Sequence, residues 1–344
     1  MIQRQPAPLR TGAVTPEEYA RLAAAIEAEV GKVIVGQADL VRQTLTCLLA
    51  EGHALIEGVP GLGKTMLLRT LSGALDLEFA RVQFTPDLMP ADIVGTQVLE
   101  EDEAGHKRFE FAPGPLFANL VLADEVNRAT PKTQSALLEA MQERASTVAG
   151  ETRPLPRPFF VMATQNPIEM EGTYPLPEAQ LDRFLFKILV EPPDPADLVE
   201  ILDRTTTGRE VAADEVVDTA TLRSMIALTR EVPLASHLAR YAASLTTATH
   251  PQRAEAPPLV TRYVRFGSSP RGAQSLVLGA KVTALLAGRL NVSEEDLRAV
   301  ARPALRHRVI LSFEALADGI SPDAVVDAVV EHIQAPSKDV ESLG

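Results

Sequence analysis

The segment Gly58–Thr65 constrains the fold of this chain more than any other stretch. It fits the pattern G-x-x-x-x-G-K-[ST], in which backbone N–H groups wrap a phosphate and glycines leave room for it. An apolar strand, Ala54–Glu57, precedes the segment, and a helix over 64–75 is predicted to turn its positive N-terminal end to the same phosphate. This strand–helix context disfavours a plain glycine turn. Lys64 is expected to reach the β- and γ-phosphates, and the Thr65 hydroxyl to bind Mg²⁺.

A pair of carboxylates follows a second apolar strand. The run Leu120–Ala123 is followed by Asp124 and Glu125, about 60 residues after the glycine-rich segment. Open α/β sheets bind ligands at the carboxyl ends of their strands. An acidic pair after a strand is more often a solvated loop, but at this distance from a phosphate-binding segment it indicates ATP hydrolysis. In such a Walker B arrangement Asp124 holds Mg²⁺ through water and Glu125 polarises the attacking water.

Polar side chains at three further positions each allow a functional and a structural interpretation. Asn166, which ends an apolar run beginning at Phe159, could contact the γ-phosphate or simply form an Asn-Pro turn. Arg183 closes a helix before an apolar strand, where an arginine is usually a surface residue or an ion-pair partner. Arg271 stands at a helix start, where a cation opposes the helix dipole and requires an anionic partner. A phosphate or a nearby carboxylate would serve.

The order of predicted elements indicates two domains after a short tail. Residues 1–15 are expected to be a mobile tail, and strands and helices alternate over 16–190, which predicts a parallel sheet with helices on both faces. The break Glu191–Pro195 separates this part from 191–344, which is predicted to be helical. The expected helices cover 16–31, 37–51, 195–206, 219–230, 234–249, 270–288 and 293–306, with a loop over 251–269 that holds an extended piece at Arg262–Phe266.

Composition narrows the class of protein. A net charge of −13 and a pI of about 5.0 disfavour DNA binding by the whole surface, although a pore can still hold a local basic patch. The single cysteine, Cys47, lies in an apolar helical stretch and is expected to be a buried structural thiol, and the histidines suggest no zinc site. No apolar signal region or membrane-length run occurs, so a cytoplasmic location is expected.

Taken in order, these residues resemble the AAA+ ATPase module, and longer stretches resemble the MoxR family. The resemblance covers about residues 20–312. The stretches that carry it are Ile34–Gln37, Phe84–Gly95, Asp124–Ala129, Gln134–Met141, Ala163–Pro167 and Leu176–Phe184.

This resemblance implies a P-loop AAA+ fold, an αβα three-layer sandwich with a parallel sheet followed by a smaller all-α lid. It assigns sensor 1 to Asn166, the arginine finger to Arg183 and sensor 2 to Arg271. Within the core it implies a helix-2 insert over 85–118, whose hairpin turns at Gly105 and faces a pore, and a second hairpin over 145–160. The residues expected to contact ATP, with adenine at the first two, are Val35, Gly36, Gly58, Pro60, Gly61, Leu62, Gly63, Lys64, Thr65 and Met66.

The resemblance also implies an assembly. A homo-hexameric ring would hold ATP at each interface, with Arg183 reaching the γ-phosphate of the neighbouring subunit and Arg271 acting in cis or in trans. Gln83 would restrain Glu125 until a substrate binds. The expected function is a chaperone-like ATPase that remodels or matures a protein complex, with a separate von Willebrand A-domain partner. The alternatives are a nucleic-acid motor, which the acidic composition disfavours, and the ATPase subunit of a metal chelatase.

Overall fold

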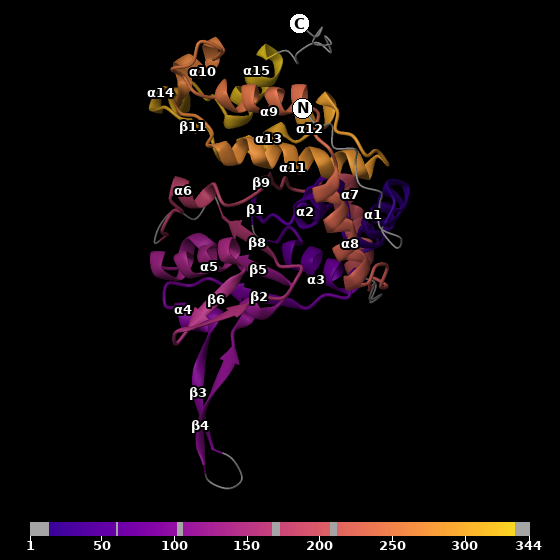
Figure 1. The fold of residues 1–344 in the computed structure, drawn as a ribbon, viewed down its shortest axis with the longest axis vertical. Coiled ribbons are helices and arrows are strands. Elements are labelled where there is room, and N and C mark those ends of the chain that lie inside the picture. The colour runs from indigo at the N-terminus through magenta and orange to yellow at the C-terminus, as the bar shows by residue number, and fades with distance from the viewer. Residues whose placement is uncertain (1–13, 60, 102–105, 167–172, 207–211, 334–344) are drawn as a thin grey trace, which may run out of the picture.

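A computed structural model describes residues 14–59, 61–101, 106–166, 173–206 and 212–333. Its centre is a parallel sheet of five strands in the order β2-β5-β8-β1-β9 (Figure 1). The chain therefore passes from β1 to the edge strand β2. The next two strands of the sheet, β5 and β8, fill the space between β2 and β1, and β9 lies on the other side of β1. The strands are β1 (Ala54–Glu57), β2 (Phe79–Gln83), β5 (Leu120–Asp124), β8 (Phe160–Gln165) and β9 (Phe186–Leu189).

Helices cover both faces of the sheet. Side chains alternate along each strand, so Ile56 and Leu122 belong to one apolar cluster and Leu55 and Val121 to another. The predicted three-layer αβα architecture is confirmed. The first cluster includes side chains of α1 (Pro16–Gly31), α2 (Ala38–Leu49) and α3 (Lys64–Ala74), and the second those of α4 (Pro90–Val94) and α5 (Pro131–Glu143); three short pieces are η1 (Pro115–Phe117), η2 (Val126–Arg128) and α6 (Glu178–Leu181).

Two antiparallel hairpins extend from the core. The segment 85–118 contains α4, η1 and the pair β3 (Gly95–Glu101) and β4 (Lys107–Pro113), which projects from the end of the core opposite the C-terminal helices (Figure 1). The expected turn residue Gly105 lies outside the described residues. The segment 145–160 contains the pair β6 (Ala145–Val148) and β7 (Glu151–Pro154).

The C-terminal part is helical, with three differences from the sequence prediction. The extended piece expected at Arg262–Phe266 is a strand only over Val264–Phe266, because Arg262 and Tyr263 end a helix. The expected loop 251–269 contains a helix, because Pro258 occupies the first helical position, where proline is tolerated. The expected helix over 293–306 is two helices that meet at Val300, since Pro303 cannot donate to the carbonyl of Ala299. The elements are α7 (Pro195–Thr206), α8 (Thr219–Glu231), α9 (Ser236–Thr247), α10 (Pro258–Tyr263), β10 (Val264–Phe266), α11 (Pro270–Leu286), α12 (Glu294–Ala299), α13 (Ala301–Leu305), β11 (Ile310–Leu311), α14 (Phe313–Ala317) and α15 (Pro322–His332).

The helical part packs closely on the core. The apolar cluster on one face of the sheet continues into α8 and α11. At Gly279 on α11, an added Cβ would lie 2.7 Å from Cζ of Phe186 on β9, so the helix approaches the sheet as closely as glycine allows. Tyr19 and Thr229 share a buried hydrogen bond of 3.1 Å between α1 and α8. Cys47 is buried in this cluster, as the sequence predicts.

Candidate active site

The carboxyl ends of four parallel strands meet at one edge of the sheet and line a pocket of about 460 Å³. Gln83 at the end of β2 is in register with Asp124 at the end of β5. Ten residues predicted from the sequence line this pocket, namely Gly58, Gly61, Leu62, Gly63, Lys64, Thr65, Met66, Asp124, Glu125 and Asn166. Pro60, also predicted, lies outside the described residues.

The glycine-rich segment forms an open loop ahead of α3. Gly61 and Gly63 have φ angles of 86° and 75°, which favour glycine over residues with a Cβ. Lys64, the first residue of α3, folds back across the loop and donates to the carbonyl oxygen of Gly58 over 2.8 Å. Partial burial lowers the pKa of the Lys64 ammonium, and the carboxylates of Asp124 and Glu125 act in the opposite direction. The loop therefore holds one cation close to two anions.

Both oxygens of the Asp124 carboxylate are engaged. Oδ1 accepts a hydrogen bond from the Thr164 hydroxyl of β8 over 2.7 Å, and Oδ2 accepts from Nη2 of Arg81 over 2.6 Å. The Thr164 hydroxyl also accepts from the backbone N–H of Glu125 over 2.8 Å. Thr164 thus fixes the end of β5 at both acidic residues.

Glu125 stands on a sharp turn after β5. Its φ of 56° places it in the left-handed region, which few non-glycine residues adopt. Its Oε2 accepts from Nε2 of Gln83 over 2.8 Å and from Nη1 of Arg128 over 2.9 Å. The contact between Gln83 and Glu125 that the resemblance implies is therefore present, while its regulatory role stays a prediction.

Arg81 and Thr164 are pocket residues that the sequence analysis missed. Each lies two residues before a residue that it did consider, Arg81 before Gln83 and Thr164 before Asn166. Side chains two residues apart on a strand point to the same face. The alternation along the strands could therefore have predicted both residues from Gln83 and Asn166.

A second pocket, of about 880 Å³, lies on the other side of the glycine-rich loop and shares Gly61, Leu62, Gly63, Met66 and Arg69 with the first. Val35 lines it, and its contact with adenine stays a prediction. Ile201 and Arg204 of α7, which the sequence analysis did not consider, also line it. Gly36 has a φ of 69°, and an added Cβ would lie 2.0 Å from Oδ2 of Asp197, also on α7. Glycine at this position lets α7 close on the pocket.

The donor set of the first pocket fits a magnesium ion delivered with phosphates. Within the described ranges no three His, Cys, Asp or Glu residues group as a metal site. Thr65 and Asp124 both line the pocket and offer hydroxyl and carboxylate oxygens. Mg²⁺ prefers oxygen ligands and is commonly held by one or two protein groups together with substrate phosphates. These two residues would hold it with ATP.

Arg183 and Arg271 lie together, away from both pockets of the glycine-rich loop. They line a separate hollow of about 310 Å³ with Arg144 and Arg308. Among the described residues that line the two loop pockets, neither Arg183 nor Arg271 occurs. The chain therefore does not bring these two arginines to its own phosphate-binding loop.

Both arginines have partners within their own subunit. Arg183 donates from Nη1 to the carbonyl oxygen of Leu138 over 2.6 Å. Across the described part of the chain, Arg183 forms no ion pair with Asp182 or Glu178. Nε of Arg271 lies 3.9 Å from Oδ2 of Asp182, so a carboxylate stands near this cation at the start of α11.

Comparisons with known proteins show the family of this chain. Residues 53–186 match the ATPase family associated with various cellular activities (AAA), and residues 258–329 match the AAA lid domain. The chain is 43% identical over 308 residues to "Chaperone MoxR1" of Mycobacterium tuberculosis, covering 90% of this chain and 81% of that protein. It is 34% identical over 347 residues to "Protein MoxR" of Methylorubrum extorquens, covering 95% and 99%.

A solved structure has the same fold. The crystal structure of a protein from Cytophaga hutchinsonii, described as an ATPase, superposes with a TM-score of 0.88 at 39% identity and covers 94% of this chain and 97% of that one. Among the described helices, none has both the length and the apolar composition needed to cross a membrane. On its identity to relatives over most of their length, the chain belongs to the MoxR family of AAA ATPases.

Proposed function

We propose that this chain hydrolyses ATP in a homo-hexameric ring and uses the energy to remodel a client protein, with a separate von Willebrand A-domain protein as partner. One observation carries the proposal. The phosphate-binding loop with its carboxylates and the arginine pair Arg183 and Arg271 line different hollows of one subunit. A ring supplies the arginines of one subunit to the loop of the next.

The proposed chemistry follows from the side chains of the first pocket. Lys64 and the backbone N–H groups around it bind the β- and γ-phosphates, and Asn166 contacts the γ-phosphate or the water. Glu125 orients the attacking water and accepts its proton. Mg²⁺, held by Thr65 and Asp124 with the phosphates, would neutralise negative charge. Arg183 of a neighbouring subunit stabilises the charge that develops on the transferred group, and Arg271 assists it.

The projecting hairpin supports a protein client. Leu99 on β3 is directly opposite Phe109 on β4, and these side chains are 56% and 71% exposed. An exposed apolar pair on a projecting element suits contact with unfolded or partly folded protein. The relative named as a chaperone agrees with this reading.

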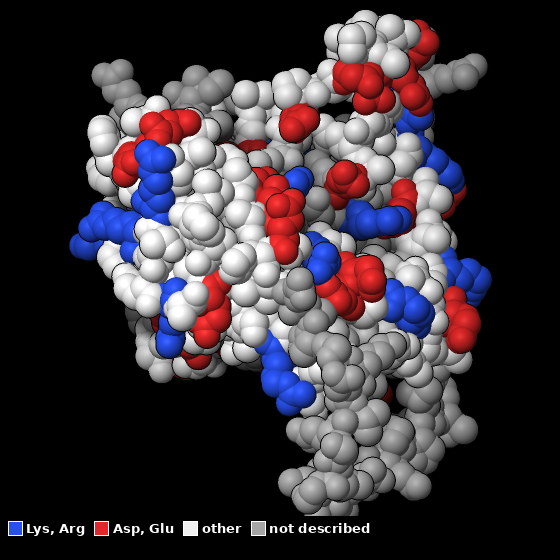
Figure 2. All heavy atoms as spheres, turned by 90° about the horizontal axis from the view of Figure 1, so that it is seen from above, with Lys and Arg blue, Asp and Glu red and all other residues white. Residues whose placement is uncertain are grey.

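The charges next to this apolar pair disfavour nucleic acid. Glu100 is opposite Arg108 and Glu101 is opposite Lys107, so the hairpin pairs opposite charges across its strands. At the opposite end of the molecule, which carries the C-terminal helices, acidic and basic side chains are also interspersed (Figure 2). A nucleic-acid motor would instead need a basic stripe.

The test measures steady-state ATP hydrolysis with two probes, carboxymethylated α-lactalbumin as an unfolded polypeptide and single-stranded DNA. We expect the polypeptide to raise the rate and the DNA to leave it unchanged. Leu99→Ser/Phe109→Ser should lose the stimulation, while the matched control Phe313→Ser, which alters an 86% exposed side chain on α14, should keep it. Stimulation by DNA alone would favour the motor. Light scattering measures the molar mass of the Glu125→Gln variant with ATP and tests whether the hexameric ring forms.

A further inference from the structure

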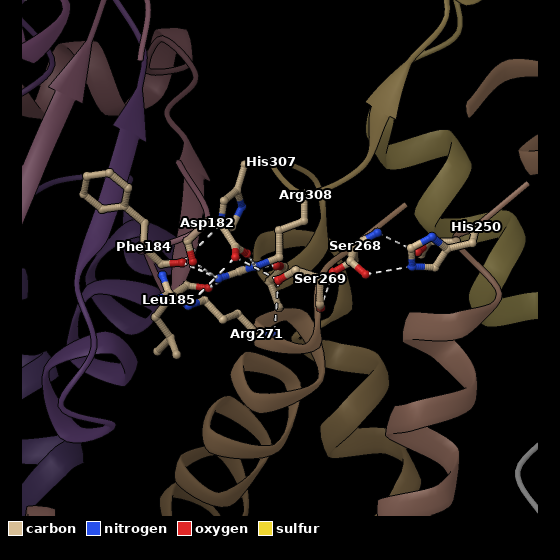
Figure 3. Close-up of polar contacts among 11 residues, drawn as sticks. Asp182, Phe184, Leu185, His250, Ser268, Ser269, Arg271, His307 and Arg308 are labelled. Carbon is tan, nitrogen blue, oxygen red and sulfur yellow. Dashed lines mark hydrogen bonds and ion pairs between the residues drawn. The ribbon is translucent and has the colours of Figure 1, made fainter. Parts of the chain in front are cut away.

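Arg308, between α13 and β11, is a buried cation that joins the helical part of the chain to the core. Its side chain is 2% exposed. It donates to Oδ1 of Asp182 over 2.8 Å and to the carbonyl oxygens of Asp182, Phe184 and Leu185 over 2.9, 2.7 and 3.2 Å (Figure 3). It also donates to the carbonyl of Ala304. Arg308 thus binds the segment between α6 and β9 through several hydrogen bonds.

Asp182 is the point on the core at which three groups of the helical part meet. Besides Arg308 on Oδ1, its Oδ2 accepts from the hydroxyl of Ser269 over 2.8 Å and lies 3.9 Å from Nε of Arg271. Ser269 is the N-cap of α11 and accepts from the backbone N–H of Arg271 over 3.1 Å. The carboxylate therefore sits at the N-terminal end of a long helix, where a negative charge is favoured (Figure 3).

Arg183 and Arg271 are both close in sequence to the contacts of the Asp182 carboxylate. Arg183 is the next residue after Asp182, and Arg271 follows two residues after Ser269. A buried ion pair is costly to desolvate and contributes most where its remaining donors and acceptors are satisfied, as they are here. Such a pair tolerates little displacement of its partners.

Resting on the proposed function, we propose that Asp182 and Arg308 are positioning residues that hold Arg183 and Arg271 in one fixed arrangement. The two arginines then approach the phosphates of the neighbouring subunit as a unit. Because Arg308 and Ser269 belong to the helical part and Arg183 to the core, the same contacts hold the two parts in one relative position, and breaking them would displace Arg183 from Arg271. Hydrolysis in one subunit thereby depends on the lid position of its neighbour.

Asp182→Asn tests the positioning with the full-length protein. The amide keeps the shape of the carboxylate and removes its charge. We expect kcat to fall at least about tenfold, because a displacement of about 1 Å at a catalytic group can cost on the order of a hundredfold. The affinity for ATP should stay within about twofold, since Asp182 lines neither pocket of the phosphate-binding loop. A general loss of structure would change both quantities.

Arg306→Gln is the matched control. Arg306 also bridges the two parts, because it pairs with Asp323 at 2.8 Å and donates to the carbonyl of Lys187 over 3.2 Å, but it does not contact Asp182. Its loss should lower the melting temperature and leave kcat within about twofold. Ser269→Ala, a milder change that removes one link to Asp182, should lower kcat less than Asp182→Asn does. It keeps the test available if Asp182→Asn does not fold.

The decisive comparison places Asp182→Asn in an Arg183→Ala background. If Asp182 acts through Arg183 and Arg271, the second change should reduce kcat much less than it does in the wild type. A full additional loss would overturn the proposal. The proposal would also be overturned if kcat is unchanged in Asp182→Asn while Arg183→Ala is slow. That outcome would leave the proposed function intact. Normal hydrolysis by Arg183→Ala itself would overturn both.

Discussion

Gln83 at the end of β2 donates a hydrogen bond from Nε2 to Oε2 of Glu125, and the two atoms are 2.8 Å apart. The same carboxylate oxygen accepts from Arg128 on the other side. The strand that carries Gln83 leads through α4 directly into the β3–β4 hairpin. A client that moves the hairpin therefore has a short covalent path to Gln83, which contacts the residue that we expect to orient water.

We expect Gln83→Ala to raise basal ATP hydrolysis and to reduce its stimulation by polypeptide. The variant removes one of two donors from Glu125, and a hydrogen bond to a charged group is worth roughly 1.5–3 kcal/mol. Since Arg128 remains, the increase should stay at or below about tenfold. Initial rates with and without carboxymethylated α-lactalbumin measure both effects, and an unchanged basal rate would contradict the restraint.

Glu125→Gln should bind ATP and hydrolyse it on the order of 10²–10⁴ times more slowly than the wild type. The amide has nearly the same shape but is a poor proton acceptor. Phosphate release and calorimetric ATP binding measure the two properties separately. Glu17→Gln, at an exposed position in the first turn of α1, is the control and should behave as wild type. Hydrolysis at the normal rate would remove Glu125 as the base.

Lys64→Ala should weaken ATP binding at least about 30-fold, because truncating one partner of a buried charge pair typically costs 2–5 kcal/mol. Lys64 lies in the loop and donates to Gly58, so its side chain is already held where phosphates would bind. Calorimetry with the non-hydrolysed analogue AMP-PNP measures the change. Lys132→Ala, on the exposed first turn of α5, serves as control. Equal affinity in the wild type and Lys64→Ala would contradict the assignment of the loop.

The sequence predicted the sheet core well because its signals are local. The helix over 16–31 was confirmed as α1, since Pro16 and the acidic residues after it mark a start that Thr15 caps. Strand β1 was confirmed at Ala54–Glu57. The short helix α10 was missed because the Pro-rich stretch 251–269 suggested a loop, although Pro257 and Pro258 both fit a helix start.

Site residues could be predicted where they belong to a sequence motif. They could not be predicted where their role depends only on how distant segments pack. Lys64 and Glu125 stand in recognisable patterns, and the structure brings them into one pocket. Arg308 gave no signal, because its function depends on a contact with Asp182 across 126 positions of the chain. The lining of the second pocket by α7 depends in the same way on how distant segments pack.

The stability of the fold should decrease as the pH falls below about 6.5. Burial lowers the pKa of His53 to about 4 from its ordinary 6.5, and its ring stays neutral because Nδ1 accepts from the N–H of Val161. Between these values the unfolded chain binds a proton that the folded chain does not, so stability is present above about 6.5 and is lost towards about 4. Burial also lowers the pKa of His307, with the same sign.

Denaturant unfolding at pH 7.0 and pH 5.5 measures this effect. The contribution of His53 to the decrease should be about 1 kcal/mol. His53→Asn keeps an acceptor near the position of Nδ1 and has no titrating ring, so it should be less stable at pH 7.0 but lose less on acidification. An equal pH dependence of the two proteins would show that folding does not lower the pKa of His53.

Arg183 should act on ATP that is bound to the neighbouring subunit. Arg183→Ala should bind ATP almost normally and hydrolyse it on the order of 10³–10⁵ times more slowly, the usual contribution of an arginine finger. Arg183 lines neither pocket of its own phosphate-binding loop within the described chain, which is why we expect binding to persist. Hydrolysis and AMP-PNP affinity of the single variant measure these two effects.

Mixing Arg183→Ala subunits with Lys64→Ala subunits tests the action across the interface. Each variant alone should be inactive, but at some interfaces of a mixed ring an intact Lys64 meets an intact Arg183, and part of the activity should return. The matched mixture combines Lys64→Ala with Glu125→Gln, which lie in the same pocket of one subunit. No subunit of that mixture has a complete pocket, so it should recover nothing. Activity in neither mixture, with mixed rings demonstrated by native mass spectrometry, would place Arg183 outside the reaction of the neighbouring subunit.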